Sequence, residues 1–234
     1  MKIFLGESIN ITMSFSNNWN KLYFKKTNLS IWPWSEVISL YFNNFPKKNK
    51  KKLNILELGC GAGANIPLFI KMNVDYYGLD GSKIVINFLK KKYPKIKKNL
   101  FVADFTKNIP INKKFDLIID RAAITCNKKS SIEKSITNLE QKLNKKGLFF
   151  GIDWYSSAST DFKKGVIDED RNTKKNMKNS IFSNAGSFHF ASKKMMINYF
   201  KKFKIRSLKH KIEVSEKGKK HKLATWTIVA EKKN

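Results

Sequence analysis

The sequence has little cysteine, little arginine, few acidic residues and no long apolar run. Its 234 residues include two cysteines, Cys60 and Cys126, which cannot build a disulfide framework and offer too few ligands for a structural zinc site. No segment reaches the roughly 18 consecutive apolar residues of a membrane-spanning helix. Residues 1–7 break too early to form the apolar core of a secretory signal. We therefore expect a soluble protein of the reducing cytoplasm, without a structural metal site or a transmembrane segment.

The shortage of acidic residues leaves a net charge of +29, because 47 lysines and arginines face 18 aspartates and glutamates. Clustered basic residues bind nucleic acids by neutralising phosphates. Here, however, the arginines (Arg121, Arg171 and Arg206) are isolated, and the lysines are spread along the chain. Abundant Lys, Asn and Ile are also typical of an AT-rich genome. The composition therefore favours a solvated lysine-rich surface with weak, salt-sensitive attraction to polyanions, and it disfavours nucleic acid as the partner.

Hydrophobic residues make up 41% of the chain, which is enough for one large domain with a sizeable core. From residue 51 onward, short apolar runs alternate with helical patterns. Such alternation is typical of a parallel sheet that is covered by helices on both faces. Ligands of these sheets bind outside the carboxyl ends of the strands. The expected strands are residues 53–58, 74–79, 100–103, 115–119 and 148–152.

Local signals mark the helices between these strands. Ser82 is placed to cap a helix whose apolar residues Ile84, Val85, Phe88 and Leu89 share one face. Ser130 and Glu133 have the spacing of a capping box at the start of a later helix. Each of these signals predicts where a helix begins or which side of it is buried.

Two further segments flank the alternating region. Residues 1–50 carry too many aromatic side chains for a plain linker, and we expect them to fold over the site as a cap. Residues 154–190 are long, polar and irregular, as expected of an insertion that contacts substrate. Residues 205–214 and 223–230 have strand patterns and a short link, so they are expected to pair antiparallel. The main domain would then be residues 51–234, with the insertion inside it.

A glycine-rich loop follows the first expected strand. From Glu57 the chain reads Glu-Leu-Gly-Cys-Gly-Ala-Gly, with glycines at positions 59, 61 and 63. Glycine lets the backbone turn sharply and approach a ligand closely. Nicotinamide-dependent enzymes have a similar fingerprint. The three alternating glycines, and the acidic residues Asp80 and Asp104 at later strand ends, disfavour that alternative.

These motifs resemble those of the class I S-adenosylmethionine-dependent methyltransferases. Residues 55–63 are similar to the family's glycine motif, residues 78–82 to its ribose-binding strand end, residues 103–105 to its adenine-binding turn, and residues 115–121 to its fourth-strand motif. The resemblance implies an α/β fold: a doubly wound, seven-stranded, mostly parallel Rossmann-like sheet with an antiparallel C-terminal hairpin. It also implies S-adenosyl-L-methionine as the cofactor and makes the main domain the catalytic domain.

The resemblance assigns cofactor contacts to particular residues. Asp80 is expected to accept hydrogen bonds from the ribose hydroxyls, and Asp104 from the adenine amine, with Phe105 against the ring. Glu57 is expected to reach the ammonium of the methionine part, while Cys60 is expected to be a small buried filler rather than a nucleophile. The full set expected at the cofactor is Glu57, Gly59, Cys60, Gly61, Gly63, Asn65, Asp80, Gly81, Ser82, Asp104, Phe105 and Asp120.

Methyl transfer is an in-line displacement, in which the enzyme aligns the acceptor with the methyl carbon and excludes water. The candidates for proton transfer or acceptor contact are Asp120, Arg121, Asp153 and His189, and each of them has a structural role as the alternative. Trp34 is expected to pack its own helix onto the sheet. The aromatic residues expected at the substrate or in the cap are Trp19, Tyr23, Trp32, Trp154 and Tyr155.

The end of the fourth strand indicates the kind of acceptor. Residues 120–123 read Asp-Arg-Ala-Ala, which is not the Asn/Asp-Pro-Pro-Tyr/Phe box of enzymes that methylate exocyclic amines in nucleic acids. Neither cysteine follows a proline, as a cytosine-type nucleophile would. We therefore expect transfer to a small-molecule acceptor, a metabolite or a sugar-type substrate. The alternatives are an RNA methyltransferase that uses the lysine-rich surface, and a cofactor-binding module without activity.

Overall fold

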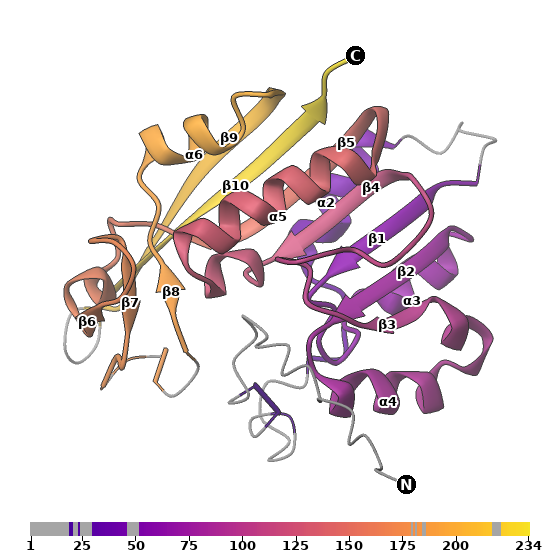
Figure 1. Ribbon diagram of the computed structural model, residues 1–234, viewed down its shortest axis with the longest axis horizontal. Helices are drawn as coiled ribbons and strands as arrows, with labels where there is room; N and C mark the ends of the chain where they lie inside the picture. The colour runs from indigo at the N-terminus through magenta and orange to yellow at the C-terminus, as the bar shows by residue number, and fades with distance from the viewer. Residues whose placement is uncertain are drawn as a thin grey trace, which may run out of the picture.

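The main sheet consists of seven strands, and helices cover both of its faces (Figure 1). Much of the expected cap, residues 1–50, lies outside the described residues. In the part of the chain that is described, no helix has the length and apolar character needed to cross a bilayer. The computed structural model describes residues 19, 20, 23, 30–45, 52–178, 180, 182, 183, 186–216 and 221–234.

The seven strands are β1 (Asn54–Leu58), β2 (Asp75–Asp80), β3 (Leu100–Val102), β4 (Phe115–Arg121), β5 (Leu143–Tyr155), β9 (Phe203–Val214) and β10 (Lys222–Lys232). Their order in the sheet is β3-β2-β1-β4-β5-β10-β9. The pairs among β1 to β5 are parallel, whereas β10 runs antiparallel to both β5 and β9. This confirms the doubly wound, mostly parallel sheet with an antiparallel C-terminal hairpin.

The helices are α2 (Ser35–Asn44), α3 (Ile66–Lys71), α4 (Lys83–Lys92), α5 (Lys129–Lys142) and α6 (Lys193–Tyr199). α5 and α6 pack on one face of the sheet, and α2, α3 and α4 pack on the other. Successive strand residues point to opposite faces. In β4, Ile118 therefore joins the core with α5, while Leu117 and Ile119 join the core with α3. Burial on both faces explains why the strands appear in the sequence as continuous apolar runs.

Parallel pairing brings the carboxyl ends of four strands to one edge of the sheet. Leu58, the last residue of β1, pairs with Leu79 of β2 on one side and with Asp120 of β4 on the other. The glycine loop, Asp80, the turn after β3 and Arg121 consequently lie next to one another in space. The alternation of strands and helices thus brings motifs that are distant in the sequence together at one site.

The predicted insertion lies between β5 and α6. It contains a 3-10 turn (Thr160–Lys163) and a small sheet of β6 (Val166–Ile167), β7 (Thr173–Lys175) and β8 (Phe188–His189). Its apolar cluster includes Phe182, Phe188 and Phe190, whose rings contact Tyr155 at the end of β5. Because Tyr155 is at the carboxyl end of its strand, the insertion is attached at the same edge as the glycine loop.

The predicted apolar face of α4 is partly correct, because two of its four residues, Val85 and Leu89, are buried. The helix buries Val85, Ile86 and Leu89, whereas Ile84 and Phe88 are 44% and 45% exposed. Five of the six residues at positions 84–89 are apolar, so neighbouring faces of this helix are almost equally apolar in the sequence. Packing against β2 and β3 selects the face that is buried.

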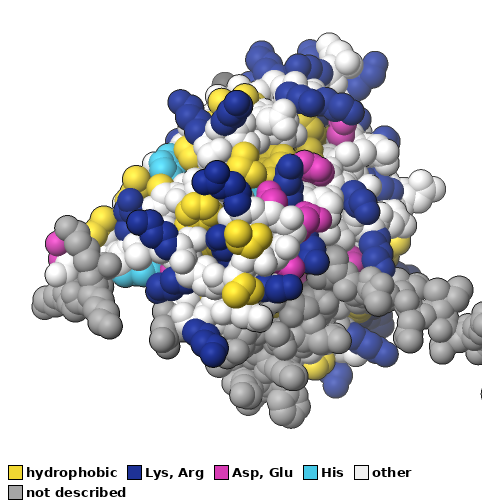
Figure 2. Space-filling model, turned by 60° about the vertical axis from the view of Figure 1, so that its left-hand side comes forward, with side chains coloured by type: hydrophobic (Ala, Val, Ile, Leu, Met, Phe, Trp, Pro, Cys, Tyr) yellow, Lys and Arg dark blue, Asp and Glu magenta, His cyan; other side chains and the backbone are white. Residues whose placement is uncertain are grey.

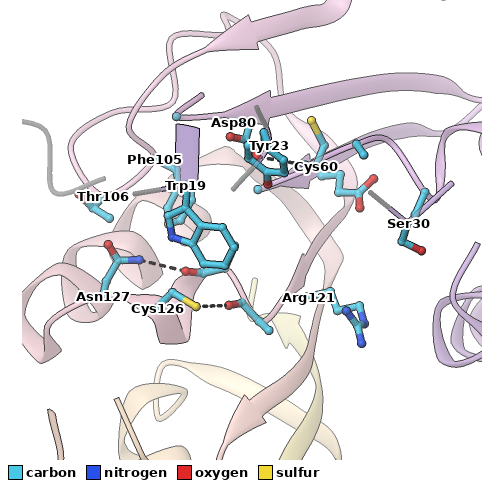
Figure 3. A pocket seen from close by; sticks show the side chains of 18 of the residues that line it. Trp19, Tyr23, Ser30, Cys60, Asp80, Phe105, Thr106, Arg121, Cys126 and Asn127 are labelled. Carbon is cyan, nitrogen blue, oxygen red and sulfur yellow. Dashed lines mark hydrogen bonds between the residues drawn. The ribbon is translucent and has the colours of Figure 1, made fainter. Parts of the chain in front are cut away.

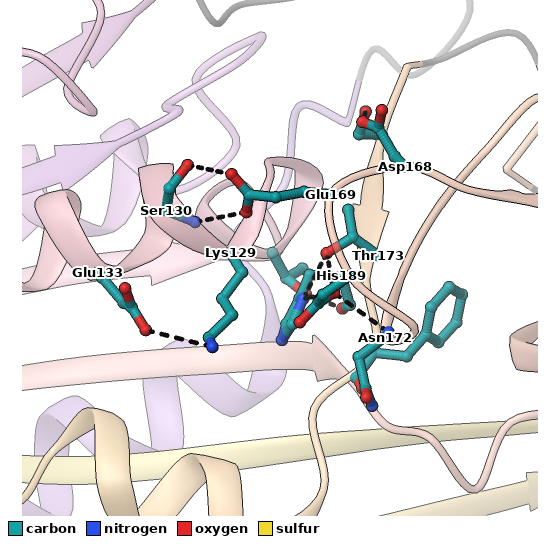
Figure 4. Close-up of polar contacts among 12 residues, drawn as sticks. Lys129, Ser130, Glu133, Asp168, Glu169, Asn172, Thr173 and His189 are labelled. Atoms are coloured by element: carbon teal, nitrogen blue, oxygen red, sulfur yellow. Dashed lines mark hydrogen bonds and ion pairs between the residues drawn. The ribbon is translucent and has the colours of Figure 1, made fainter.

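The predicted capping box at the start of α5 is also wrong. The helix begins after Lys128, and Ser130 uses both its backbone N–H and its hydroxyl to donate to Glu169 (Figure 4). Glu133 instead lies 3.9 Å from the ammonium of Lys129. A carboxylate from the insertion therefore takes the place of the local cap, where negative charge is favourable. The contact links the insertion to α5.

Candidate functional site

A cavity of about 450 Å³ opens at the carboxyl edge of β1 to β4, between this edge and the insertion (Figure 3). Its volume lies in the range of small-ligand sites. Residues from the N-terminal segment, from four strand ends and from the insertion line it together. Of the residues predicted from the sequence, the cavity brings together Trp19, Tyr23, Glu57, Gly59, Cys60, Gly61, Asp80, Gly81, Asp104, Phe105, Arg121 and Tyr155.

The glycine loop forms one wall of this cavity. Gly59 has a φ of +62°, and a Cβ at this position would lie 2.3 Å from the Cβ of Ala123 in the loop after β4. Glycine is therefore needed for the two strand-end loops to touch. Gly61 donates its backbone N–H to the carboxylate of Asp80 at 3.0 Å. The conformation of the loop is thus linked to the end of β2.

Asp80 ends β2 and is only 4% exposed. Its two carboxylate oxygens accept hydrogen bonds from the backbone N–H groups of Gly61, at 3.0 Å, and Ser82, at 2.8 Å. Burial raises the pKa of Asp80 to about 6, although these two bonds favour the ionised form. The side-chain oxygen of Asn20 accepts from the Ser82 hydroxyl at 2.6 Å. Tyr23 lies beside Asp80 in the cavity, so the N-terminal segment covers this corner (Figure 3).

Glu57 is a buried acid in β1 whose carboxylate is held from behind. It accepts from the hydroxyl of Tyr76 at 2.7 Å and from the side-chain amide of Asn65 at 2.8 Å. Burial raises the pKa of Glu57 to about 7, while these bonds and the charge of Arg121 act in the opposite direction. Asn65 lies behind the cavity wall and also accepts from the backbone N–H of Trp34 at 3.1 Å. It therefore links Glu57 to the start of α2.

Asp104 and Phe105 follow β3 and form another part of the wall. Thr106 donates to one carboxylate oxygen of Asp104 through both its backbone N–H, at 3.0 Å, and its hydroxyl, at 2.6 Å. Such a turn is typical of aspartate in loops. The carbonyl of Phe105 accepts from the side chain of Asn138 in α5 at 3.0 Å. These contacts hold a carboxylate and an aromatic ring next to each other.

Asp120 is fully buried beneath the cavity and does not line it. It accepts from the indole N–H of Trp154 at 2.6 Å and from the backbone N–H groups of Ala123, at 3.1 Å, and Ile124, at 2.9 Å. Burial raises the pKa of Asp120 to about 7. Trp154 is likewise in the core. The two residues hold the loop after β4, in which Ala122 has a φ of +56°.

Arg121 lies on the cavity wall between an aromatic ring and an acid. Its guanidinium carbon is 3.4 Å from the ring centroid of Trp34, and one of its nitrogens is 2.8 Å from a carboxylate oxygen of Asp153. The prediction that Trp34 packs its helix onto the sheet is wrong, because Trp34 precedes the first turn of α2 and lines the cavity instead. The guanidinium of Arg121, stacked on Trp34, thus places a positive charge at the cavity, and Asp153 neutralises this charge.

His189 lies in β8, outside the cavity. It is 1% exposed, and one ring nitrogen is 2.9 Å from the hydroxyl of Thr173 (Figure 4). The other ring nitrogen is 2.8 Å from the hydroxyl of Tyr199. Burial lowers the pKa of His189 to about 4, so the ring is neutral near pH 7. This geometry favours a structural role that connects the insertion to α6. Trp32 is also outside the cavity, with 74% of its surface exposed.

Several residues that line the cavity were not predictable from a sequence motif. Cys126 and Asn127 follow β4, and Phe182, Ser183 and Phe188 come from the insertion. The phenylalanines stand out in an otherwise polar segment, which was the available signal for them. No pattern marks Asn127, because its position depends on how the loop after β4 turns.

A family model described as "Methyltransferase domain" matches residues 49–222 of the chain. The curated protein "O-methyltransferase 3" of Dictyostelium discoideum is 39% identical over 75 residues. This match covers 30% of the present chain and 17% of that protein, so the chain spans less than a fifth of the relative's length.

Solved structures share the fold over most of the chain. TehB from Haemophilus influenzae has a TM-score of 0.62 and 18% identity, over 91% of this chain and 66% of that chain. An S-adenosylmethionine-dependent methyltransferase from Clostridium acetobutylicum has a TM-score of 0.62 and 16% identity, over 92% of this chain and 96% of that chain. At such identities the similarity concerns the fold.

Proposed function

The chain belongs to the methyltransferase-domain family, its cofactor is S-adenosylmethionine, and from this premise we propose that it transfers a methyl group to a small-molecule acceptor. The observation that supports this most is the composition of the cavity. Three acids from successive strand ends, Glu57, Asp80 and Asp104, line it together with the glycine loop, and the insertion supplies apolar residues beside them. One cavity thus offers surfaces for both a polar donor and a second molecule.

The residues of the cavity fit the parts of the cofactor. In this proposal Asp80 accepts from the ribose hydroxyls, since its carboxylate is held at the end of β2 by two backbone N–H groups. Asp104 accepts from the adenine amine, and Phe105 lies against the ring. Glu57 receives the ammonium group, and the methionine part lies along the glycine loop, where Gly59 and Gly61 line the cavity.

When bound, the cofactor supplies an electrophilic methyl carbon on a sulfonium sulfur. The cofactor would thereby supply the methyl group that a nucleophilic atom of the acceptor takes up, with S-adenosylhomocysteine as the second product. The chain contributes alignment and exclusion of water. In this proposal Arg121 lies on the wall with its charge neutralised by Asp153, and Asp120 and Trp154 position the loop after β4.

The division into a cap, residues 1–50, and a catalytic domain, residues 51–234, is part of the same proposal. Trp19 and Tyr23 line the cavity, and Asn20 bonds to Ser82 next to Asp80. These contacts support a cap over the donor end. The cytoplasmic location expected from the cysteine content stays a prediction.

Incubating the protein with isotopically methyl-labelled cofactor and a fractionated cell extract tests the proposal. We expect label in the small-molecule fraction, because the cavity of about 450 Å³ has the size of a small-ligand site. Lysines and arginines are scattered over the face in Figure 2 rather than gathered in one patch. Label confined to RNA would contradict the acceptor class and support the RNA alternative, and absence of label from every fraction would contradict transfer itself.

The affinity for S-adenosylhomocysteine, the demethylated cofactor, should rise between pH 6 and pH 8. Burial raises the pKa of Glu57 to about 7, so the acid is mostly neutral at pH 6 and mostly ionised at pH 8. Since the ionised form attracts the ammonium, affinity should increase by about tenfold over this interval. Titration calorimetry at several pH values measures it.

The matched control for this prediction is Glu57→Gln, which keeps the shape and cannot ionise. Its affinity should stay near the low-pH value, apart from the smaller contribution of Asp80, whose pKa is about 6. An equally steep rise in the glutamine variant would show that another group controls the ammonium end.

A further inference from the structure

We propose that the methyl acceptor is a flat aromatic molecule that carries an O–H or N–H group and binds in an aromatic chamber of the cavity. The chamber is defined by Trp19, Tyr155, Phe182 and Phe188, all of which line the cavity. This inference rests on the proposed function and names the substrate class of the same site.

The rings of the chamber are already packed as aromatic clusters usually are. The centroid of Phe182 lies 4.5 Å from that of Tyr155, at an interplanar angle of 73°, and 4.8 Å from that of Phe188. The rings of Tyr155 and Phe188 are 5.9 Å apart. Edge-to-face and tilted arrangements at these distances are favourable, and an inserted flat ring extends them.

The chamber and the donor-type residues come from different parts of the fold. Glu57, Asp80 and Asp104 belong to β1, β2 and the turn after β3, whereas the chamber is built mainly from the end of β5 and the insertion. The three carboxylates of the cavity thus lie at the strand ends, whereas the chamber is provided mainly by the end of β5 and the insertion. The chamber is the part that remains for the acceptor once the donor occupies the strand ends.

The charges around the chamber disfavour a cationic acceptor, and its apolar walls disfavour a sugar-like one. Among the described residues that line the cavity, the carboxylates are those of Glu57, Asp80 and Asp104, at the strand ends. A cation in the chamber would face the positive sulfonium without a carboxylate of its own, and a sugar would lose its hydrogen bonds to water against aromatic walls. A neutral aromatic ring meets neither cost.

One polar group beside the chamber is suited to orient the acceptor. The side-chain nitrogen of Asn127 donates to the carbonyls of Ala123, at 3.0 Å, and Ile124, at 3.2 Å. These bonds fix the amide and leave its oxygen as the atom with which Asn127 can bind a ligand, as a hydrogen-bond acceptor. An acceptor molecule therefore fits the chamber if its flat ring packs against the aromatic walls and its O–H or N–H group donates to the side-chain oxygen of Asn127.

The test compares 2-naphthol with its saturated counterpart, decahydro-2-naphthol, in the presence of saturating S-adenosylhomocysteine. Saturation-transfer NMR gives the dissociation constant of each probe with the full chain. We expect 2-naphthol to bind about tenfold more tightly or better, because only the flat ring can stack. Equal binding of the two probes, or no binding of 2-naphthol, would overturn the proposal.

Variants locate the site. Phe182→Leu and Phe188→Leu should each weaken 2-naphthol binding by about fivefold or more, with the affinity for S-adenosylhomocysteine unchanged. Phe162→Leu is the matched control, because Phe162 belongs to the same insertion and contacts Phe190 but does not line the cavity. An equal effect of all three changes would contradict the chamber.

The measurements separate this inference from the function on which it rests. If the wild-type chain fails to bind S-adenosylhomocysteine, the proposed function fails as well. If it binds S-adenosylhomocysteine but does not distinguish the two probes, only the aromatic acceptor is wrong. The comparison of probes uses the wild-type chain, so it holds even where a leucine variant folds poorly.

Discussion

Replacement of Asp80 by alanine should weaken binding of S-adenosylhomocysteine by at least about tenfold, on the order of 1.4 kcal/mol or more. The carboxylate is buried at the end of β2, where it accepts from Gly61 and Ser82. Its loss removes the proposed acceptor for the ribose hydroxyls. It also leaves two backbone N–H groups without their partner, one of which belongs to the glycine loop. Titration calorimetry on the folded variant measures the effect.

Asp116→Ala is the matched control for this change. Asp116 is also a carboxylate of the sheet that accepts from the chain, with the backbone N–H of Asn54 at 2.9 Å and the side chain of Asn144 at 2.8 Å. It does not line the cavity, since β4 places it near the opposite end of the strand. Donor affinity should therefore be unchanged in this variant. Equal affinity of the Asp80 variant and the wild type would remove Asp80 from the donor site.

Gly59→Ala should lower the free energy of unfolding by about 2–5 kcal/mol. The φ of +62° is unfavourable for any residue with a Cβ, and the new methyl group would lie 2.3 Å from the Cβ of Ala123. Ala123 cannot retreat easily, because its backbone N–H is bonded to buried Asp120. The loops after β1 and β4 must separate, which also changes the shape of the cavity. Chemical denaturation measures the stability.

Gly61→Ala serves as the comparison for this prediction. Its φ is +49°, but the nearest atom to a Cβ there is the hydroxyl oxygen of Tyr23 at 3.2 Å, at the end of a side chain. We therefore expect a loss of only about 1–2 kcal/mol, from the backbone conformation alone. If the two variants lost the same stability, the contact between Gly59 and Ala123 would not be the reason for glycine at position 59.

Strands and strand-end motifs were predictable from the sequence, because they depend on local patterns. Buried parallel strands need continuous apolar runs, and a loop that turns tightly needs glycine, so Glu57 to Gly63 could be placed between a strand and a helix. Ser82 caps α4 as predicted, since its hydroxyl accepts from the backbone N–H of Val85 at 3.3 Å. Each of these features involves residues within a few positions of one another.

Features that depend on distant partners were not predictable. The partner of Ser130 is Glu169, 39 positions away, and the residue stacked on Arg121 is Trp34. His189 looked suited to proton transfer, but the structure places it between Thr173 and Tyr199, away from the cavity. No periodicity in the sequence records such pairings.

The sequence by itself determined the order of strands and helices, the glycine loop, and the acids at the end of β2 and in the turn after β3. Only the tertiary structure decided that Asp120 and His189 are buried and do not line the cavity, that Trp34 covers Arg121, and that Phe182 and Phe188 line the same cavity as the acidic residues. The physical reason is the range of the interactions. Backbone turns and apolar periodicity act over a few residues, whereas burial and side-chain pairing depend on which segments the sheet brings together.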